Sequence, residues 1–282
     1  MCIGLYIHIP FCESKCPYCN FYSFIPGEND MDNFTIALCR HMKSFLENNG
    51  RVSIDTIYFG GGTPSLLKEK RLSYIMDFIY KSFDIKHPEA TLEINPARGK
   101  ALNFKALKSI GFNRLSVGLQ SAINDDLKFL NRLNTSQDAY NTIYNAKKSG
   151  FDNISADLMI ALPYQTKENI TTSIEFCSIM DIQHVSSYML KIEPHTPFYN
   201  IKDDLLLKDD EESADMYIHT CKALEQHGFF QYEISNFAKP GFKSKHNLKY
   251  WSCDEYIGFG PSAHSFFRRK RFYYNDSFKD FI

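Results

Sequence analysis

The chain has 282 residues, of which 44% are hydrophobic, and its 32 basic and 33 acidic side chains leave a formal net charge of -1. This length can bury one large barrel-type domain with an appendage, or two smaller domains. The balanced charge gives the whole chain no electrostatic footprint for nucleic acid, so we expect no nucleic-acid partner. The sequence starts without a signal-peptide pattern and has no apolar run near the roughly 20 residues of a membrane helix, which predicts a cytoplasmic protein.

Short β-rich runs alternate with helical patterns, which predicts βα units carrying a parallel sheet. We expect strands at residues 5–9, 56–59, 91–94, 114–117, 154–160 and 184–190. Apolar residues recur at helical spacing over 34–46 and 72–83, and these faces are expected to belong to the core. Glycine, asparagine and proline residues follow the strand ends, where an α/β barrel keeps its working loops.

The pattern changes after about Ile201. A charged, helix-forming stretch at 209–226 is followed by a tail at 228–282 that reads as irregular and aromatic-rich. We therefore predict a core barrel over residues 1–201 and a C-terminal extension over 202–282.

Three cysteines lie within eight residues of the stretch YIHIPFCESKCPYCNF. Cys12, Cys16 and Cys19 follow the spacing C-x3-C-x2-C, which is typical of zinc or iron–sulfur ligands. A structural zinc needs a fourth ligand, for which His8 is the local candidate although it lies inside a predicted strand. A [4Fe–4S] cluster can be held by three cysteines, which leaves one iron free for an outside ligand. The other five cysteines are scattered, as buried structural cysteines are.

This motif resembles that of the radical S-adenosylmethionine (radical SAM) superfamily. In that superfamily the free iron of a [4Fe–4S] cluster binds the amino and carboxylate groups of SAM. The flanking YIHIPFC is similar to the branch that contains oxygen-independent coproporphyrinogen III oxidases and HemW-like haem chaperones. The resemblance implies an α/β fold, a partial (β/α)6 TIM-like radical SAM barrel, with a short C-terminal extension. It also implies that the branch's usual helical C-terminal domain is mostly absent here, so that the aromatic end docks on the barrel or on a partner.

Side chains suited to SAM follow successive predicted strands. The glycines of GGGTP, at 60–64, let backbone groups approach a ligand closely. Glu93 could accept hydrogen bonds from the amine of SAM, and Arg132 could pair with its carboxylate. Gln120 and Asp157 could bind the ribose hydroxyls, although each of these residues alone could equally be a solvated surface group. By resemblance, the SAM-contacting positions are Tyr6, Tyr18 through its backbone, Gly61, Gly62, Thr63, Glu93, Gln120, Arg132 and Asp157.

The sequence departs from the branch at two of these loops. Asn134 stands where a histidine is usual, two residues after Arg132, and the loop after Asp157 reads IALP, with Ala161, where an aromatic–glycine pair is common. Neither departure removes an expected ligand of the cluster or of SAM.

Two features distinguish the chaperones from the oxidases in this resemblance. The oxidases carry a further cysteine two residues after the triplet and an N-terminal extension, whereas this chain has Phe21 and only five residues before Tyr6. The chaperones carry an H-N-x-x-Y-W motif, which stands here as HNLKYW from His246 to Trp251. Both features favour haem handling over porphyrin synthesis.

His246 is the candidate haem ligand, because imidazole is a common axial ligand of haem iron. The alternative is a hydrogen-bonded structural histidine. His264 is a second candidate. The basic run from Arg268 to Arg271 could pair with haem propionates or an acidic partner, or could simply be a solvated face.

These features predict a radical SAM protein that binds a [4Fe–4S] cluster, SAM and haem, and that passes haem to a haem-accepting protein. An electron donor such as flavodoxin or ferredoxin is expected, as is peripheral membrane contact through the acceptor. The alternative is an oxygen-independent coproporphyrinogen III oxidase. A third possibility is another radical SAM activity such as methyl transfer, for which the sequence shows no second cysteine cluster.

Overall fold

The computed structural model describes residues 2–96 and 102–282. Its centre is a run of six parallel strands that neighbour one another in chain order. They are β1 (Ile3–Ile9), β2 (Ser53–Gly61), β3 (Asp84–Ile94), β4 (Arg114–Gln120), β5 (Ile154–Ile160) and β6 (His184–Met189). The two outer strands of this run, β1 and β6, pair with other strands rather than with each other, so the barrel is open. The predicted α/β class and partial barrel are confirmed.

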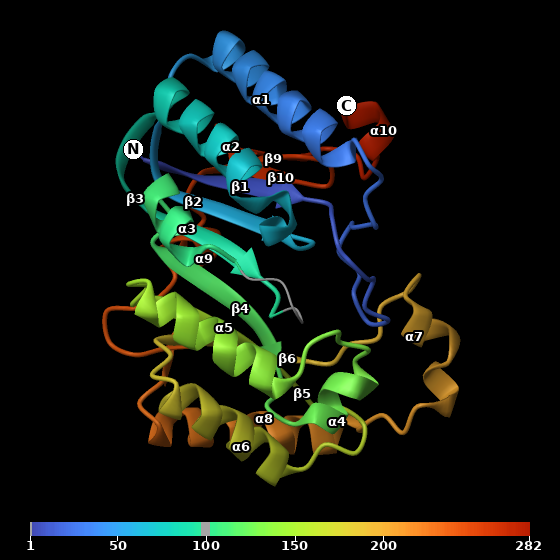
Figure 1. Cartoon of the computed structure of the whole chain (residues 1–282). Coiled ribbons are helices and arrows are strands. Elements are labelled where there is room, and N and C mark those ends of the chain that lie inside the picture. Colours follow the sequence, from blue (N-terminus) through green and yellow to red (C-terminus); the bar gives the residue numbers. More distant parts are fainter. Residues whose placement is uncertain (1, 97–101) are drawn as a thin grey trace.

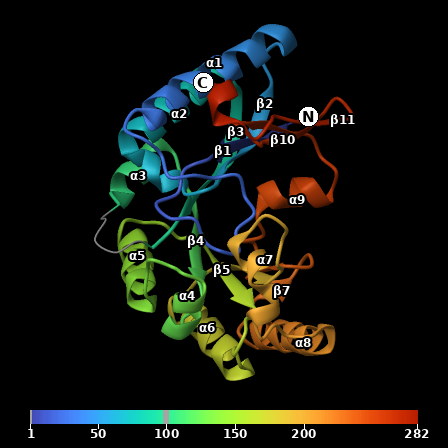
Figure 2. The same cartoon turned by 90° about the vertical axis from the view of Figure 1, so that its right-hand side faces the viewer.

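Helices cover the outer face of the curved sheet (Figures 1 and 2). They are α1 (Asp30–Asn49), α2 (Lys68–Ser82), α3 (Phe104–Ile110), α5 (Ser136–Lys148) and α6 (Lys167–Ile179), with the short η1 (Pro64–Leu67) and α4 (Asn124–Phe129) in the loops. Thr135 and Thr166 begin α5 and α6 as N-caps, each accepting a hydrogen bond from a backbone N–H in the first turn. The starts of α5 and α6 are therefore encoded locally.

The strands alternate between an apolar and a polar face. Leu5, Ile7 and Ile9 of β1 are fully buried against the helices, while Tyr6 and His8 point to the other side. The side of the sheet that Tyr6 and His8 face is its inner face, which lines the lumen of the open barrel. Residues that are register partners in adjacent strands lie on the same face, so the pairing identifies the other residues of the inner face. Its residues are largely polar and include Tyr58, Thr91, Glu93, Arg114, Ser116, Ser155, Asp157, His184 and Ser186. The result is a polar lumen inside an apolar shell.

The segment after residue 201 is more regular than its sequence predicted. It forms α8 (Asp210–Gln226), β7 (Phe230–Gln231), β8 (Asn236–Ala238), α9 (Lys245–Trp251), β9 (Tyr256–Phe259), β10 (His264–Phe267), β11 (Lys270–Tyr273) and α10 (Phe278–Phe281), preceded by α7 (Pro197–Asn200) and η2 (Lys202–Asp204). The prediction of an irregular tail was wrong, because two- to four-residue strands are too short for a periodic pattern to show. β9 pairs with β1 and β8 pairs with β6, so this segment extends the sheet at both edges. The domain boundary near residue 201 stays a prediction.

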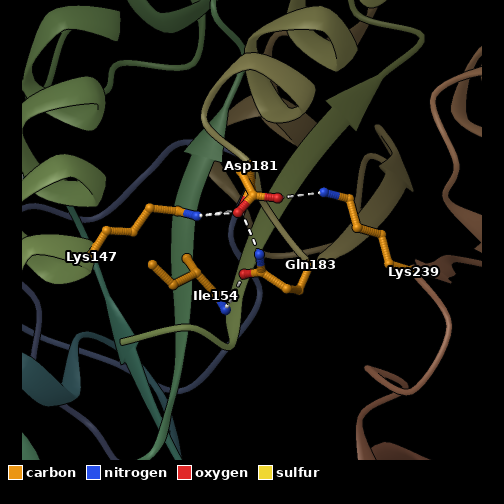
Figure 3. A network of polar contacts seen from close by, with 5 residues as sticks. All are labelled: Lys147, Ile154, Asp181, Gln183 and Lys239. Atoms are coloured by element: carbon orange, nitrogen blue, oxygen red, sulfur yellow. Dashed lines mark hydrogen bonds and ion pairs between the residues drawn. The ribbon is translucent and has the colours of Figure 1, made fainter. Parts of the chain in front are cut away.

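A surface network fastens this segment to the barrel where β5 and β6 begin (Figure 3). The Asp181 carboxylate lies 2.9 Å from Lys147 Nζ and 2.7 Å from Lys239 Nζ. Lys239 is the residue that follows β8. The two lysines hold the pKa of Asp181 below its usual range. Gln183 donates to the Asp181 carbonyl at 2.6 Å and accepts from the Ile154 N–H at 3.1 Å.

The aromatic end of the chain packs on the barrel. The Phe278 ring of α10 lies 5.7 Å from the Phe11 ring and 5.0 Å from the Phe24 ring, and the Phe281 ring lies 5.6 Å from that of Phe34. These contacts cover the segment that leads into and out of the three cysteines. Within residues 2–96 and 102–282, no helix combines the length and apolar character needed to cross a membrane.

Candidate functional site: the mouth of the lumen

The three cysteines lie in the loop that leaves the carboxyl end of β1. All three thiols are free and half-buried. The Cys12 N–H donates to the Phe24 carbonyl at 2.9 Å, and the Cys19 N–H donates to the Cys16 carbonyl at 3.1 Å. In the described residues no three His, Cys, Asp or Glu side chains are arranged as the ligands of a single metal ion.

The glycine loop after β2 holds this cysteine loop in place. Gly62 N–H donates to the Ile9 carbonyl at 2.8 Å, and Thr63 N–H donates to the Phe11 carbonyl at 2.7 Å. A Cβ at Gly62 would lie 2.6 Å from the Phe11 carbonyl oxygen, and backbone cannot move aside as a side chain can. Gly61 has φ +106, which favours glycine, and a Cβ there would lie 2.6 Å from the His8 side chain. Gly62 is therefore required by the close approach of two backbone segments, and Gly61 by its backbone conformation.

A chain of polar contacts runs across the mouth from one cysteine to another. Arg132 Nη1 lies 3.6 Å from Cys16 Sγ, and Arg132 Nη2 donates to Asn95 Oδ1 at 2.8 Å. Asn95 Nδ2 donates in turn to Thr63 Oγ1 at 2.8 Å, and Thr63 Oγ1 lies 3.7 Å from Cys12 Sγ. The loops after β1, β2, β3 and β4 are thereby linked through Asn95.

Sequence reasoning did not assign Asn95 a role, and its position before Pro96 at a strand end was the available signal.

The Arg132 guanidinium retains unused donor capacity. Its Nε is buried without a hydrogen-bond partner, and its Nη2 also donates to the Gly118 carbonyl at 3.0 Å. A Cβ at Gly118 would lie 3.2 Å from Nη2, so this glycine lets the guanidinium reach the strand backbone. No carboxylate of the described residues pairs with Arg132. This arrangement suits a ligand that brings its own carboxylate.

Glu93 and Asp157 face the lumen from β3 and β5. Tyr58 donates a 2.8 Å hydrogen bond to Glu93 Oε1, and Ser116 donates to Asp157 Oδ1 at 3.2 Å. Burial, together with the charge of Asp157, raises the pKa of Glu93 to about 7. Burial likewise raises the pKa of Asp157. Among the described residues neither half-buried carboxyl has a directly bonded cation, which fits the polar and amine groups of a ligand.

An open cavity of about 370 Å³ adjoins the cysteine loop. Its walls include Cys16, Thr63, Asn95 and Arg132, which are the same groups that form the polar chain across the mouth. Asn134, the departure from the usual histidine, is 5% exposed and also lines it. The cavity shows that space for a ligand exists directly beside the three cysteines.

Three further predicted residues lie in the middle of β1, in the cysteine loop and at the end of β4. Tyr6 faces the lumen and its hydroxyl shares a 3.1 Å hydrogen bond with His8 Nδ1. Tyr18 lies in the cysteine loop with its ring 6.5 Å from that of Phe198. Gln120 ends β4 at φ +65, beyond a register shift in the pairing with β5. Ala161, at φ +57 after β5, occupies the left-handed region that favours glycine.

Two histidines predicted as possible ligands have other partners. His8 bonds the Tyr22 carbonyl through Nε2 at 2.9 Å and Tyr6 through Nδ1, so it does not complete a zinc site with the cysteines. His246 is 1% exposed in α9, with Nδ1 2.8 Å from Thr56 Oγ1 and Nε2 2.9 Å from the Tyr250 hydroxyl. Both of its ring nitrogens are therefore occupied.

The sequence pattern of the Radical SAM superfamily matches residues 6–177. Over 267 residues the chain is 42% identical to the heme chaperone HemW of Bacillus subtilis, a match that covers 93% of this chain and 70% of that protein. The chain belongs to the HemW family of the radical SAM superfamily. HemW of Lactococcus lactis is 37% identical over 261 residues, covering 92% of this chain and 68% of the relative.

One further curated protein and one solved structure extend the comparison. A mitochondrial radical S-adenosyl methionine domain-containing protein 1 of Danio rerio is 35% identical, with 94% of this chain and 60% of that protein covered. Coproporphyrinogen III oxidase (HemN) from Escherichia coli superposes with a TM-score of 0.81 at 22% identity, over 94% of this chain and 64% of that one. This last likeness shows the shared fold. The chain spans 60 to 70% of the length of these curated relatives.

Proposed function

We propose that the protein is a cytoplasmic haem chaperone that carries one [4Fe–4S] cluster on Cys12, Cys16 and Cys19, binds SAM at the mouth of the lumen, and passes bound haem to an acceptor protein. The observation that carries this proposal is the linked mouth, in which Arg132, Asn95 and Thr63 join two of the three cysteines. The 42% identity to a relative named heme chaperone supports the choice of function.

The residues of the mouth would divide the binding of SAM between them. Arg132 offers its free Nε and the edge of its guanidinium to the carboxylate, and Glu93 offers an oxygen to the amine. Gln120 and Asp157 would bind the ribose hydroxyls, and the Ser116 hydroxyl donates a hydrogen bond to Asp157. The reduced cluster would supply an electron for the cleavage of SAM, delivered by a donor such as flavodoxin or ferredoxin. The protein's own contribution is to position the ligand and to exclude water.

Phe21 supports haem handling over coproporphyrinogen oxidation. This side chain is 64% exposed beside the cysteine loop, at the position where the oxidases carry a further cysteine. An exposed aromatic ring is a suitable contact for an apolar porphyrin or for the surface of an acceptor protein. Any membrane contact would come through that acceptor.

The proposal is tested by a haem titration paired with a turnover assay. The anaerobically reconstituted protein is titrated with haem, and the same preparation is given coproporphyrinogen III, SAM and a reductant. We expect a saturable Soret band with one haem per chain and no release of CO2. Robust CO2 release would identify an oxidase, and absence of a saturable Soret band would reject the chaperone.

His264 is the better candidate for the axial ligand. Its side chain is exposed at the start of β10, and its ring stacks 5.2 Å from that of Tyr273, which is 65% exposed. We expect His264→Ala to shift the Soret band, whereas substitution of His87, which is also exposed, should leave it unchanged. A wild-type haem spectrum in His264→Ala would exclude this ligand.

A further inference from the structure

We propose that the HNLKYW segment of α9 supports the SAM site through its buried histidine, with His246 positioning Tyr58 and, through it, Glu93, rather than coordinating haem iron. This inference rests on the proposed function, because it assigns a role in the binding of SAM. The HNLKYW motif, which distinguishes this branch, would then lie against the lumen rather than on a haem-binding surface.

His246 is buried inside the protein. Only 1% of the residue is exposed, and its two ring nitrogens bond Thr56 and Tyr250 at 2.8 and 2.9 Å. Its backbone N–H donates to Glu89 Oε1 at 3.1 Å. Burial, with the nearby charges of Lys249 and Arg114, lowers the pKa of His246 to about 3, so the ring is neutral. Haem iron could reach this ring only if α9 left the barrel.

A second feature is the contact between His246 and the predicted SAM site. The imidazole stacks on the Tyr58 ring, with centroids 5.2 Å apart and planes inclined by 28°. The Tyr58 hydroxyl donates the 2.8 Å hydrogen bond to Glu93 Oε1. The ring centroid of Tyr6, on the neighbouring strand, lies 6.4 Å from that of His246 and 6.2 Å from that of Tyr58. The ring of His246 therefore limits where the tyrosine that orients Glu93 can lie.

The helix α9 itself is fixed firmly enough to act as a support. Lys249, 7% exposed, pairs with Asp55 at 2.9 Å and donates to the Cys2 carbonyl at 3.3 Å. A Cβ at Gly4 would lie 3.0 Å from the Lys249 side chain and 3.1 Å from the His246 ring, so β1 carries a glycine where the helix crosses it. Figure 2 shows α9 on the side of the sheet opposite α1, α2 and α3.

The lumen contains a second histidine that provides a matched control. His184 of β6 is fully buried, and its ring nitrogens bond the Ser155 and Tyr232 hydroxyls, each at 2.7 Å. It thus shares with His246 the burial, the strand hydroxyl and the tyrosine partner. The difference lies in the ring that each histidine packs against, because His184 contacts Tyr232 whereas His246 contacts Tyr58.

The experiment measures SAM and haem binding by the same anaerobically reconstituted variants. His246→Gln keeps an amide for hydrogen bonding but loses the stacked ring, and Tyr58→Phe keeps a ring but loses the bond to Glu93. We expect both to weaken SAM binding in equilibrium dialysis by about tenfold, as loss of supporting contacts commonly does, with unchanged cluster content and Soret band. In the double variant SAM affinity should fall by less than the product of the two single-variant factors, because His246 acts through Tyr58. His184→Gln should stay within about twofold of wild type.

The inference is overturned if His246→Gln binds SAM as wild type does, or if it loses the haem spectrum. Should that variant fail to fold, Tyr250→Phe removes only the Nε2 partner, and wild-type SAM affinity in it would overturn the inference equally. A wild-type protein that assembles no cluster, or binds no SAM, would instead reject the proposed function. Equal SAM binding by wild type and all variants would reject the inference alone.

Discussion

Arg132 Nη2 donates a 2.8 Å hydrogen bond to Asn95 Oδ1, and this contact joins the loops after β3 and β4 across the mouth of the lumen. The other end of the Asn95 amide donates to Thr63, which lies against Cys12. One uncharged amide thus links the expected carboxylate-binding guanidinium to the loop that carries the cysteines. A residue outside the expected ligand set therefore determines the relative positions of the members of that set.

Substitution of Asn95 should disturb both stability and cluster assembly. Asn95→Leu leaves Arg132 and Thr63 each without a partner at a half-buried site, which we expect to cost about 2 kcal/mol in the free energy of unfolding. Iron bound after reconstitution should fall to half or less. Urea denaturation and iron analysis measure the two effects. Asn48→Ala, at an exposed position of α1, is the control and should change stability by less than about 0.5 kcal/mol. Equal behaviour of the two variants would contradict the linking role.

Gly62 should tolerate no side chain. In Gly62→Ala the new Cβ would lie 2.6 Å from the Phe11 carbonyl oxygen and 2.9 Å from that of Ile9, so the two loops must separate. We expect a loss of about 2 kcal/mol or more and reduced cluster loading, because the Gly62 and Thr63 N–H groups hold the cysteine loop. Gly27→Ala is the matched control, since its Cβ would meet only the flexible Asp30 carboxylate at 3.2 Å. A Gly62→Ala protein as stable as Gly27→Ala would refute the packing argument.

Glu93 should make stability fall as the pH rises. Its pKa is raised from 4.5 to about 7 by burial, so between these values the folded protein holds a proton that the unfolded chain has released. The contribution is fully present below pH 4.5 and is lost as the pH rises through 7, by up to about 3 kcal/mol at 1.36 kcal/mol per pKa unit. The raised pKa of Asp157 acts in the same direction.

Glu93→Gln isolates this effect. The variant should show a smaller fall in unfolding free energy between pH 5 and pH 8 than wild type, when both are measured by urea denaturation without cluster. Glu47→Gln, at a side chain that is 64% exposed on α1, should follow the wild-type curve. If Glu93→Gln retains the full pH dependence, Glu93 is not the group that titrates.

The sequence predicted the six parallel strands because each has a buried, apolar outer face that alternates with polar residues, as in Leu5, Tyr6 and Ile7. It also indicated which loops form the mouth, since the ends of parallel strands meet at one edge. The individual SAM-contacting roles stay predictions. The structure brings Cys12, Cys16, Thr63 and Arg132 into one connected set.

Other features depend on tertiary contacts that no local pattern shows. The short strands β7 and β8 exist because an edge of the sheet is available to pair with them. Asn95 acquires its role from two side chains that are 32 and 37 residues away in sequence. The burial of His246 depends on Thr56, 190 residues distant, so its choice between ligand and structural residue could not be read from HNLKYW itself.

The claim on which the rest depends is that Cys12, Cys16 and Cys19 hold a [4Fe–4S] cluster. Iron, sulfide and zinc analysis of the anaerobically reconstituted protein tests it directly, with Cys16→Ser and the exposed Cys253→Ser as a matched pair. We expect about four irons and four sulfides per chain in wild type and in Cys253→Ser, and loss of the cluster in Cys16→Ser. One tightly held zinc without sulfide, or a full cluster in Cys16→Ser, would contradict the account.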